Sequence, residues 1–491
     1  MLGTAERAGD EPAVIDGRTT VRYDELAARS LAVASTLKDA GTRPNDRVAI
    51  LLRRSPDAAA AFFGVLAAGA IAVVVNEQLR PRQIEHVLDH SGSSALLTCG
   101  EMVNRLPRRL ATNDTVVDVG ELPVAASATP VSRIGSDVAQ IVYTSGSTGL
   151  PKGVTFSHAN LWAGMHAVTS YVGISRRDRI ASLLPFSFDY GLNQLLCAVG
   201  TGAALVIERS PIAARVVQTL REQEVTVLPA VPPLWLQLLN VADFRAGPMP
   251  SLRALTNTGG RLPRAAVRAL RAAQPQAELF LMYGLTEAFR STYLPPDRAD
   301  RKPTSIGQAI PGAEVLVISK DLEECGPGEV GELVHRGPTV ALGYWNDQAA
   351  TARVYRPHPL RPRGSPDAER VVFSGDLVYR DEEGDLFFVG RDDAMIKTLG
   401  YRVSPDEVTD ALYASGEVVE AVVASEPDDL RGERIVAYVV LTEEGSMERL
   451  EQFATREMPR YMQPTRIEVR DELLRTASGK HDAAATARDR R

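Results

Sequence analysis

The sequence predicts an α/β protein with a doubly wound parallel sheet, because helical and strand-like segments alternate over residues 20–390. An amphipathic helix is expected to begin at Tyr23, and an apolar strand to occupy residues 47–52. A helix with a proline in its first turn follows at residues 81–90, and another strand at 94–98. Alternation of this kind is typical of βαβ units, in which a helix connects two parallel strands.

The chain is also too long for a single hydrophobic core, since it has 491 residues. After residue 305, the helix–strand alternation gives way to short strand-like segments separated by Gly and Pro, at residues 313–318, 331–335 and 386–389. This change predicts a β-rich subdomain that closes the large α/β domain.

A smaller α+β unit is expected near the C-terminus. Ser404 is predicted to cap a helix, with Pro405 at its first position and Glu407 completing a capping box. Strand-like segments at residues 418–424 and 434–441 precede a helix at 447–456. The Ala/Arg/Asp-rich residues after position 480 are expected to be disordered.

Charge and hydropathy exclude some functional classes. The net charge of −7, without a basic block, argues against a nucleic-acid binder. Residues 58–75 carry no charge and approach the length of a membrane span. Gly69 divides this segment into a helix-like and a strand-like part, which predicts a buried helix followed by a buried strand rather than a membrane helix.

The N-terminus and the cysteines indicate a cytoplasmic protein. No apolar segment follows Met1 closely enough to form a signal peptide. The three cysteines, Cys99, Cys197 and Cys325, are far apart and form no C-x-x-C pair, so neither a disulfide framework nor a metal knuckle is predicted.

The most specific motif is a loop rich in glycine and hydroxyl groups, Tyr-Thr-Ser-Gly-Ser-Thr-Gly-Leu-Pro-Lys-Gly-Val at residues 143–154, directly after an apolar strand. Such a loop can bring backbone N–H groups close to phosphate oxygens. It is not a Walker loop, because its glycines and lysine are spaced G-x-x-G-x-x-K. It resembles the phosphate loop of the adenylate-forming superfamily, which contains acyl-CoA synthetases, adenylation domains of nonribosomal peptide synthetases, and luciferases. The resemblance assigns nucleotide contacts to Thr144, Ser145, Gly146, Ser147, Thr148, Gly149 and Lys152.

Five further segments resemble this superfamily in the same order, so the resemblance covers nearly the whole chain. The turn at residues 256–260 resembles the one beside adenine, which implies nucleotide contacts for Gly259 and Gly260. The resemblance of residues 282–287 implies that Tyr283 and Gly284 lie against adenine, Thr286 meets the phosphate and Glu287 helps to hold Mg²⁺. A metal is chemically reasonable there, because it offsets the negative charge of ATP.

The remaining motifs concern the ribose and the movement of the small domain. By resemblance, Asp376 binds the ribose hydroxyls and Arg391 adds a ribose or phosphate contact. Asp393 is the implied hinge, which divides the chain into a large domain at 1–389, a hinge at 390–393 and a small domain at 394–491. Lys480, in the segment Arg-Thr-Ala-Ser-Gly-Lys, is the implied catalytic lysine that bridges the carboxylate and the developing phosphate charge. The loop used after rotation, during thiol transfer, would contain Lys397, Gly400, Tyr401 and Arg402.

The acid-binding pocket is less clearly defined by the motifs. Phe188-Asp189 resembles amino-acid-activating members, in which the aspartate pairs with the substrate amine, whereas acyl-CoA synthetases commonly carry histidine at the position of Phe188. Arg290 could clamp a second substrate carboxylate, or it could pair with Asp189 and remove the need for an amine. The segment around Arg290 also resembles a group of bacterial AMP-forming acyl-CoA ligases. The other expected substrate contacts are Tyr190, Asn193, Thr258 and Met282.

These motifs predict an AMP-forming acid–thiol ligase that uses ATP and Mg²⁺. The preferred substrate is an amino acid or another amine-bearing acid, transferred to the phosphopantetheine thiol of a carrier protein; the alternative is a non-amino acid transferred to CoA. Two other classes are a catalytically silent nucleotide-binding homologue and a luciferase-like oxygenase. The joint presence of Lys152, Glu287, Asp376, Arg391 and Lys480 argues against the first, and nothing in the sequence supports the second.

Overall fold

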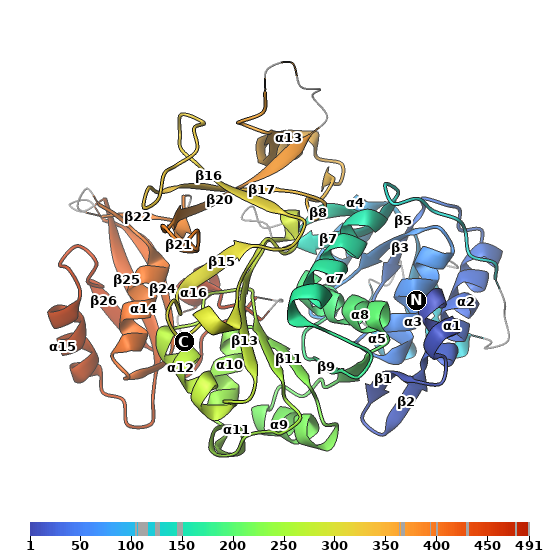
Figure 1. Cartoon of the computed structure of the whole chain (residues 1–491), viewed down its shortest axis with the longest axis horizontal. Helices are drawn as coiled ribbons and strands as arrows, with labels where there is room; N and C mark the ends of the chain where they lie inside the picture. The colour runs from blue at the N-terminus through green and yellow to red at the C-terminus, as the bar shows by residue number, and fades with distance from the viewer. Residues whose placement is uncertain are drawn as a thin grey trace.

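The chain folds around three β-sheets, which lie side by side across the molecule (Figure 1). The structure is a computed structural model. It describes residues 1–103, 106, 116–122, 128–144, 151–362, 364, 369–392, 394–398, 401–428, 432–476 and 479–489.

One sheet combines the N-terminal βα units with a hairpin. Strands β7, β4, β3, β5 and β6 run parallel, β8 pairs antiparallel with β7, and β18 pairs antiparallel with β8. The order along the sheet is β18 (Gly343–Tyr344), β8 (Lys152–Ser157), β7 (Val138–Thr144), β4 (Ile71–Val74), β3 (Arg47–Ile50), β5 (Ser93–Thr98) and β6 (Val116–Asp118).

A second, longer sheet changes character along its length. Its parallel half fits the predicted βαβ pattern. The parallel strands are β1 (Pro12–Asp16), β10 (Ala204–Ile207), β9 (Arg179–Ser182), β11 (Val227–Ala230), β12 (Ala254–Asn257) and β13 (Glu278–Tyr283). Strand β2 (Thr19–Arg22) pairs antiparallel with β1 at the edge of the sheet.

The other half of this sheet is antiparallel and forms the β-rich part expected from the sequence. The antiparallel pairing begins just after β13, slightly earlier than residue 305. Its strands are β14 (Thr292–Leu294), β15 (Ser305–Ala309), β21 (Leu386–Arg391), β20 (Arg370–Arg380), β17 (Gly331–Arg336) and β16 (Glu314–Ile318), with β19 (Tyr355–Pro357) paired to β20.

Helices cover the sheets, and one hydrophobic core joins residues of both sheets to α2, α3, α7 and α8. Close packing of α3 on α2 requires Gly64, because a Cβ there would lie 2.5 Å from the Cβ of Val33. The helices of this part are α1 (Leu2–Ala8), α2 (Tyr23–Asp39), α3 (Pro56–Ala67), α4 (Pro81–Ser91), α5 (Gly100–Val103), α7 (His158–Val172), α8 (Asp189–Thr201), α9 (Ala213–Glu222), α10 (Pro232–Leu239), α11 (Ala242–Ala246), α12 (Arg264–Ala273) and α13 (Gln348–Val354), with 3₁₀ turns η1 (Val119–Glu121), η2 (Thr286–Ala288) and η3 (Pro296–Arg298).

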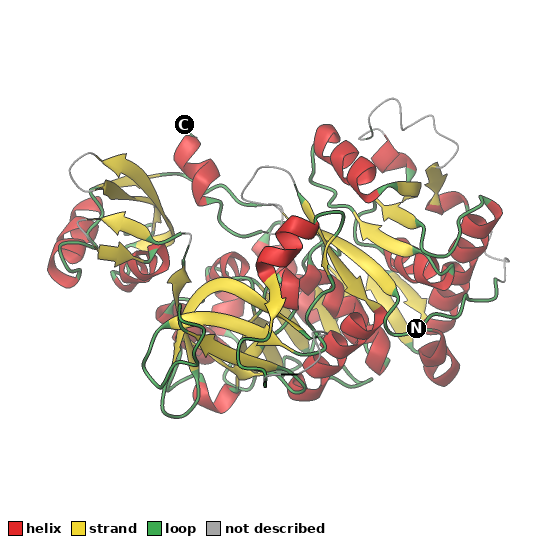
Figure 2. Ribbon diagram, turned by 90° about the horizontal axis from the view of Figure 1, so that it is seen from above, coloured by secondary structure: helices red, strands yellow, loops and turns green. Residues whose placement is uncertain are grey.

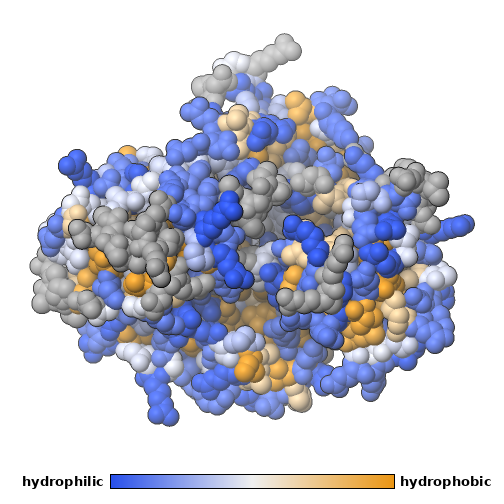
Figure 3. Space-filling view, turned by 180° about the vertical axis from the view of Figure 1, so that it is seen from behind, coloured by the Kyte–Doolittle hydropathy of each residue, from blue (hydrophilic) through white to orange (hydrophobic). Residues whose placement is uncertain are grey.

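The uncharged segment at residues 58–75 forms a buried helix and a buried strand, as predicted. Helix α3 ends at Ala67, and Gly69 takes a left-handed conformation with φ of 75° before β4 begins at Ile71. Across the described residues, no helix has both the length and the apolar character needed to cross a membrane. The face of the molecule in Figure 3 is mainly hydrophilic, with apolar groups between polar ones.

The C-terminal part forms a small α+β domain, visible as a separate lobe at one end of the molecule (Figure 2). Its own core contains Ile396, Val408, Leu412, Val439 and Leu450. The domain consists of β22 (Ile396–Thr398), β23 (Tyr401–Val403), β24 (Val418–Asp428), β25 (Gly432–Leu441), β26 (Arg466–Val469), α14 (Pro405–Ala414), α15 (Met447–Glu457) and α16 (Ala483–Arg488). The boundary at residues 390–393 remains a prediction.

Two local predictions for this domain were wrong. The residues after Lys480 were expected to be disordered, but residues 483–488 form α16, which Asp482 caps by accepting a hydrogen bond from Ala485 N–H at 2.8 Å. Ala487 then packs against the outer face of the small sheet. Ser404 is the N-cap of α14 and Pro405 lies at its start, as predicted, but the Ser404 side chain makes no capping hydrogen bond, so the predicted capping box with Glu407 is not formed.

Candidate active site

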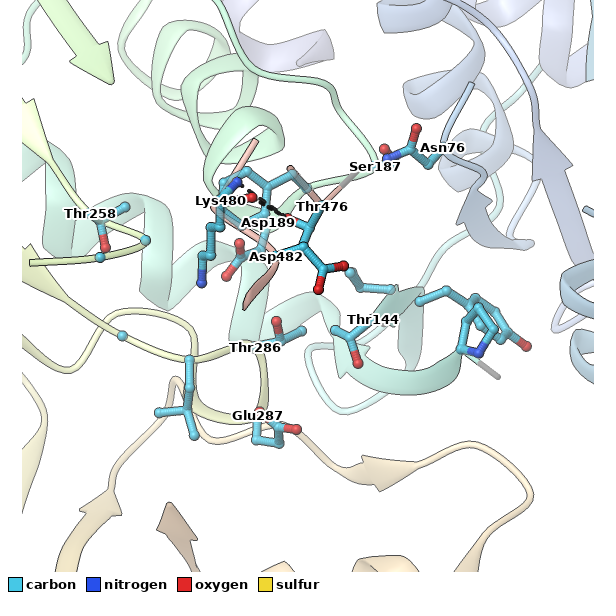
Figure 4. Close-up of a pocket in the computed structure, with 18 of the residues that line it drawn as sticks. Asn76, Thr144, Ser187, Asp189, Thr258, Thr286, Glu287, Thr476, Lys480 and Asp482 are labelled. Carbon is cyan, nitrogen blue, oxygen red and sulfur yellow. Dashed lines mark hydrogen bonds between the residues drawn. The ribbon is translucent and has the colours of Figure 1, made fainter. Parts of the chain in front are cut away.

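A cavity of about 840 Å³ lies between the large part of the chain and the small domain, and it contains most of the predicted site residues. Figure 4 shows Lys480 of the small domain beside Asp189 of the large part, with Thr258, Thr286 and Glu287 around the same space. The predicted residues that line it are Thr144, Phe188, Asp189, Thr258, Gly259, Gly260, Met282, Tyr283, Gly284, Thr286, Glu287, Asp376, Arg391 and Lys480.

The predicted phosphate loop connects the two strands of a hairpin. Thr144 at the end of β7 pairs with Lys152 at the start of β8, so the hairpin brings both ends of the loop to one place. Thr144 lines the cavity. Lys152 does not line it, and its Nζ lies 5.7 Å from the ring centre of Tyr344. Five predicted contacts of the loop, Ser145, Gly146, Ser147, Thr148 and Gly149, lie outside the described residues, as does the predicted hinge, Asp393.

The expected ribose site is a cluster around the Asp376 carboxylate. The Tyr283 hydroxyl donates a hydrogen bond to Asp376, and the Arg391 guanidinium lies 3.2 Å from the same carboxylate. Burial, together with the Asp376 charge, raises the pKa of the Tyr283 phenol, which keeps this group a donor. The ring of Tyr283 stacks beside that of His335, with ring centres 6.0 Å apart.

Glu287 is held by a tyrosine that the sequence analysis missed. The Tyr344 hydroxyl donates a hydrogen bond of 2.6 Å to Glu287 Oε1. Tyr344 lies in β18, next to β8, and therefore reaches Glu287 only after the fold has formed. No local pattern in the sequence signals this contact.

The turn between Glu287 and Arg290 has an unusual backbone conformation. Phe289 has φ of 54° and ψ of −106°, a region that residues with a side chain seldom adopt. Two glycines permit it: a Cβ at Gly164 would meet the Phe289 ring, and a Cβ at Gly284 would meet the Phe289 carbonyl. The turn sends Arg290 into the protein interior.

Asp189 in the cavity wall forms a buried pair with Arg290 behind it. Arg290 Nη1 lies 3.9 Å from Asp189 Oδ2, and the two side chains are 2% and 6% exposed. The other carboxylate oxygen of Asp189 accepts a hydrogen bond from Tyr190 N–H at 2.7 Å. The Arg290 guanidinium also lies over the Tyr190 ring, 4.6 Å from its centre.

Three of the predicted substrate contacts therefore do not line the cavity. Arg290, Tyr190 and Asn193 are buried behind Asp189, and Asn193 is 0% exposed. The Tyr190 hydroxyl bonds to the Thr256 carbonyl at 2.8 Å, so its polar end faces the sheet.

Lys480 reaches the cavity next to the glycine turn. Gly259 has φ of 81°, and a Cβ on it would lie 3.3 Å from Lys480 Cε and 3.7 Å from the Phe188 ring. Lys480 keeps contact with solvent in the cavity, yet the protein around it removes part of the water from its ammonium group. This desolvation lowers the pKa of the group. The Asp189 charge acts in the opposite direction.

A further contact that the sequence analysis missed joins the two parts of the protein. Arg261, directly after the glycine turn, lies 2.8 Å from Asp410 on α14 of the small domain. Arg261 lines the cavity together with Asp406, one turn before Asp410 on the same helix. The small domain is thus held with Lys480 at the cavity.

Comparison with known sequences decides the family. The sequence model described as "AMP-binding enzyme" matches residues 3–345, and that of its C-terminal domain matches residues 407–480. The chain belongs to the AMP-binding enzyme family. It is therefore a member of the adenylate-forming superfamily and an AMP-forming ligase.

The relatives of this AMP-forming ligase include parts of large synthetases and one shorter protein. It is 32% identical over 491 residues to a linear gramicidin synthase of Brevibacillus parabrevis, covering 98% of this chain but only 9% of that protein. It is 29% identical to novobiocin biosynthesis protein H of Streptomyces niveus, covering 98% of this chain and 80% of the relative.

Solved structures share the fold of the ligase along its whole length. The o-succinylbenzoate CoA synthetase of Bacillus subtilis, in complex with its acyl-adenylate, superposes with a TM-score of 0.86 at 27% identity, covering 100% of this chain and 98% of that one. A benzoate CoA ligase of Burkholderia xenovorans gives a TM-score of 0.86 at 27% identity, covering 97% and 96%. Both likenesses extend through the small domain.

Proposed function

We propose that this chain activates a carboxylic acid with ATP and then transfers the acyl group to a phosphopantetheine thiol. The observation that carries the proposal is the placement of Lys480 from the small domain in the same cavity as Asp376, Glu287 and Thr286 of the large part. The Lys480 ammonium group, the Asp376 carboxylate that would accept from the ribose, and the Thr286 and Glu287 side chains that would meet the phosphates and their metal thus line one cavity. In the first step, a carboxylate oxygen attacks the α-phosphorus of ATP, the bond to the β-phosphate oxygen breaks, and pyrophosphate leaves.

The nucleotide would lie along the β13–η2 segment. The Tyr283 ring offers a flat face for adenine, and the Asp376 carboxylate is a suitable acceptor for two vicinal ribose hydroxyls. Arg391, already beside Asp376, would add a contact to the ribose or a phosphate. The Thr286 hydroxyl and the loop between Thr144 and Lys152 would donate to the phosphates.

The residues present fit a magnesium ion that is bound together with the phosphates. The described residues contain no cluster of three or more metal ligands, but Mg²⁺ in such sites takes one or two carboxylates, with phosphate and water completing its shell. Glu287 would be that carboxylate, oriented by Tyr344. Bound there, the ion would offset the phosphate charge.

Lys480 would stabilise the charge that develops during adenylation. Its side chain enters from a separate domain, so it can serve the first step and leave before the second. We infer that the small domain then rotates about residues 390–393, with Asp393 as the hinge. Rotation would present the segment with Lys397 and Tyr401, and the thiol would attack the acyl carbonyl and displace AMP.

The buried pair behind the cavity favours an acid without an amine. Asp189 lines the cavity next to Phe188. Arg290, which lies behind Asp189, is close enough to balance its charge. No ammonium group is then needed to compensate it. We therefore place a non-amino carboxylic acid, transferred to CoA, first among the possible reactions; the CoA ligases with the same fold support this choice.

An amine-bearing acid delivered to a carrier protein is the second candidate. It is favoured by the fact that Asp189 lines the cavity while Arg290 does not, and by relatives that are peptide synthetases. In that case Asp189 would lie between Arg290 and the substrate amine.

ATP–pyrophosphate exchange with a panel of aryl acids, fatty acids, dicarboxylates and amino acids tests the proposal. We expect exchange with a non-amino acid, and AMP release on addition of CoA. Exchange confined to amino acids would establish the second candidate instead. No exchange with any acid, from a folded protein that binds ATP, would contradict the proposed function.

A further inference from the structure

The segment that carries Lys480 is a hairpin closed at its base. Arg475 and His481 pair as an isolated antiparallel bridge, and Thr476 N–H donates to the Lys480 carbonyl at 2.7 Å. Lys480 N–H in turn lies 3.2 Å from the Thr476 hydroxyl. Gly479 completes the turn with φ of 85°. These bonds close the base of the hairpin, but they do not fix its position on the small domain.

One carboxylate on the sheet of the small domain contacts both sides of the hairpin base. Glu420 in β24 accepts a hydrogen bond from the Arg475 guanidinium through Oε1. Its other oxygen, Oε2, lies 3.3 Å from His481 Nε2. Arg475 and His481 are the two residues that close the hairpin, so Glu420 holds it at both sides.

Glu420 is buried, and its charge therefore depends on the two cationic partners in the hairpin base. The residue is 9% exposed, and a buried carboxylate is costly unless cations accompany it. Burial alone would raise the pKa of Glu420, but His481 and Arg475 outweigh this effect and the pKa is lowered. The charged form of Glu420 is thus the one that the hairpin base stabilises.

We propose that Glu420 is a positioning residue for adenylation, because it holds the Arg475–His481 hairpin base and thereby sets where Lys480 enters the cavity. The proposal rests on the proposed role of Lys480 in the first step. Glu420 itself does not line the cavity, so its effect must pass through the hairpin. Small displacements of a catalytic group are sufficient to lower a rate strongly.

The test compares Glu420→Gln with a matched control on the same strand. Glu426 also lies in β24 and pairs with two arginines, Arg434 and Arg466, and no described residue of the hairpin is among its salt-bridge partners. Glu420→Gln should lower kcat of ATP–pyrophosphate exchange by about 10- to 100-fold with little change in KM for ATP, whereas Glu426→Gln should leave both constants unchanged. The exchange uses the acid of the panel that reacts fastest with the wild type.

A second measurement needs no substrate. Hydrogen–deuterium exchange of the peptide over residues 473–483 should become faster in Glu420→Gln and stay unchanged in Glu426→Gln, because the hairpin base loses its anchor. Unchanged hydrogen exchange in a folded Glu420→Gln protein would overturn the proposal. So would a kcat loss of the same size in both variants.

Lys480→Ala separates this inference from the proposed function. In the Lys480→Ala background, Glu420→Gln should cause no further loss, because both changes act through the same side chain. A full additional loss there would show that Glu420 acts in another way and would overturn the positioning role. If Lys480→Ala itself keeps wild-type exchange, the proposed role of Lys480 fails, whatever Glu420→Gln shows.

Discussion

The guanidinium of Arg290 lies 3.9 Å from the carboxylate of Asp189, which lines the cavity in which Lys480 ends, and Arg290 is buried behind it. Arg290 has no second acidic partner among the described salt bridges, while Asp189 faces the cavity. Arg290 is therefore placed to balance the charge of Asp189 from inside the protein, and Lys480 acts on it from the cavity. This relationship moves our preference from an amine-bearing acid to a non-amino acid.

Substitutions of the pair should affect all acids alike. Asp189→Asn and Arg290→Ala should each lower kcat/KM about 5- to 100-fold for every accepted acid, since a buried charged group that loses its partner costs about 1–3 kcal/mol. The double variant should recover part of this loss. The measurement is pyrophosphate exchange with an amine-bearing acid and its desamino analogue.

The control is an ion pair that does not line the cavity, buried Asp178 with the partly exposed Arg253, whose nitrogen and oxygen are 2.7 Å apart. Asp178→Asn should lower thermal stability without changing the ranking of acids. A loss in Asp189→Asn that is confined to amine-bearing acids would contradict the neutral pair and support amino-acid activation.

Tyr344→Phe should weaken the use of Mg²⁺. The substitution removes the 2.6 Å hydrogen bond that orients Glu287 but keeps the ring. We expect the Mg²⁺ concentration for half-maximal exchange to rise about 10- to 100-fold, as is typical when the hydrogen-bond partner of a metal ligand is removed. Tyr379→Phe is the control, because Tyr379 stacks on Phe387 away from the cavity. An unchanged Mg²⁺ dependence would argue against Glu287 as the metal ligand.

Acid should destabilise the folded protein through His335. Burial lowers the pKa of this imidazole from 6.5 to about 3, and the side chain is 2% exposed. The unfolded chain binds the proton below about pH 6.5, whereas the folded protein resists it until about pH 3. The free energy of unfolding therefore falls as pH falls through this window, by on the order of 3 kcal/mol between pH 7 and pH 4.

Denaturant unfolding at several pH values checks this effect. His335→Phe keeps a ring beside Tyr283 and should flatten the pH dependence between pH 7 and pH 4. Equal slopes in the wild type and His335→Phe would show that His335 does not contribute.

The hinge prediction has its own test in Asp393→Pro. Proline fixes φ near −65° and restricts rotation at this position. Adenylation should stay largely intact, because the small domain already places Lys480 at the cavity, whereas thiol transfer should slow. Wild-type rates for both half-reactions would place the hinge elsewhere.

Much of the fold followed from local patterns in the sequence. The segment around Gly69 was predicted as a buried helix and strand because charge-free residues, a glycine and β-branched residues occur in that order. The small-domain strands followed from apolar runs of suitable length. Helix α16 was missed although Asp482 offers a local cap, because a helix of 6 residues is marginal alone and here also packs through Ala487 on the small sheet.

In the site, too, residues in contiguous motifs were predicted, whereas contacts between distant residues were not. Contiguous motifs identified Tyr283, Glu287 and Asp376, which line one cavity. The partner of Glu287 was not predictable, since Tyr344 meets it from 57 residues away. The contact between Arg475 and Glu420, 55 residues apart, was not predictable either. Such pairs depend on tertiary packing. The same holds for Arg290, which the motif placed in the pocket but the Phe289 turn directs into the interior.

The central claim, that this ligase adenylates an acid with Lys480 of the small domain, is tested most directly by the two half-reactions of Lys480→Ala. The account predicts a loss of about 10²–10³-fold in ATP–pyrophosphate exchange. It also predicts thiol transfer from a supplied acyl-adenylate at nearly the wild-type rate. Lys320→Ala, a change of an exposed lysine, should alter neither. Near-wild-type exchange in a folded Lys480→Ala protein would contradict the account.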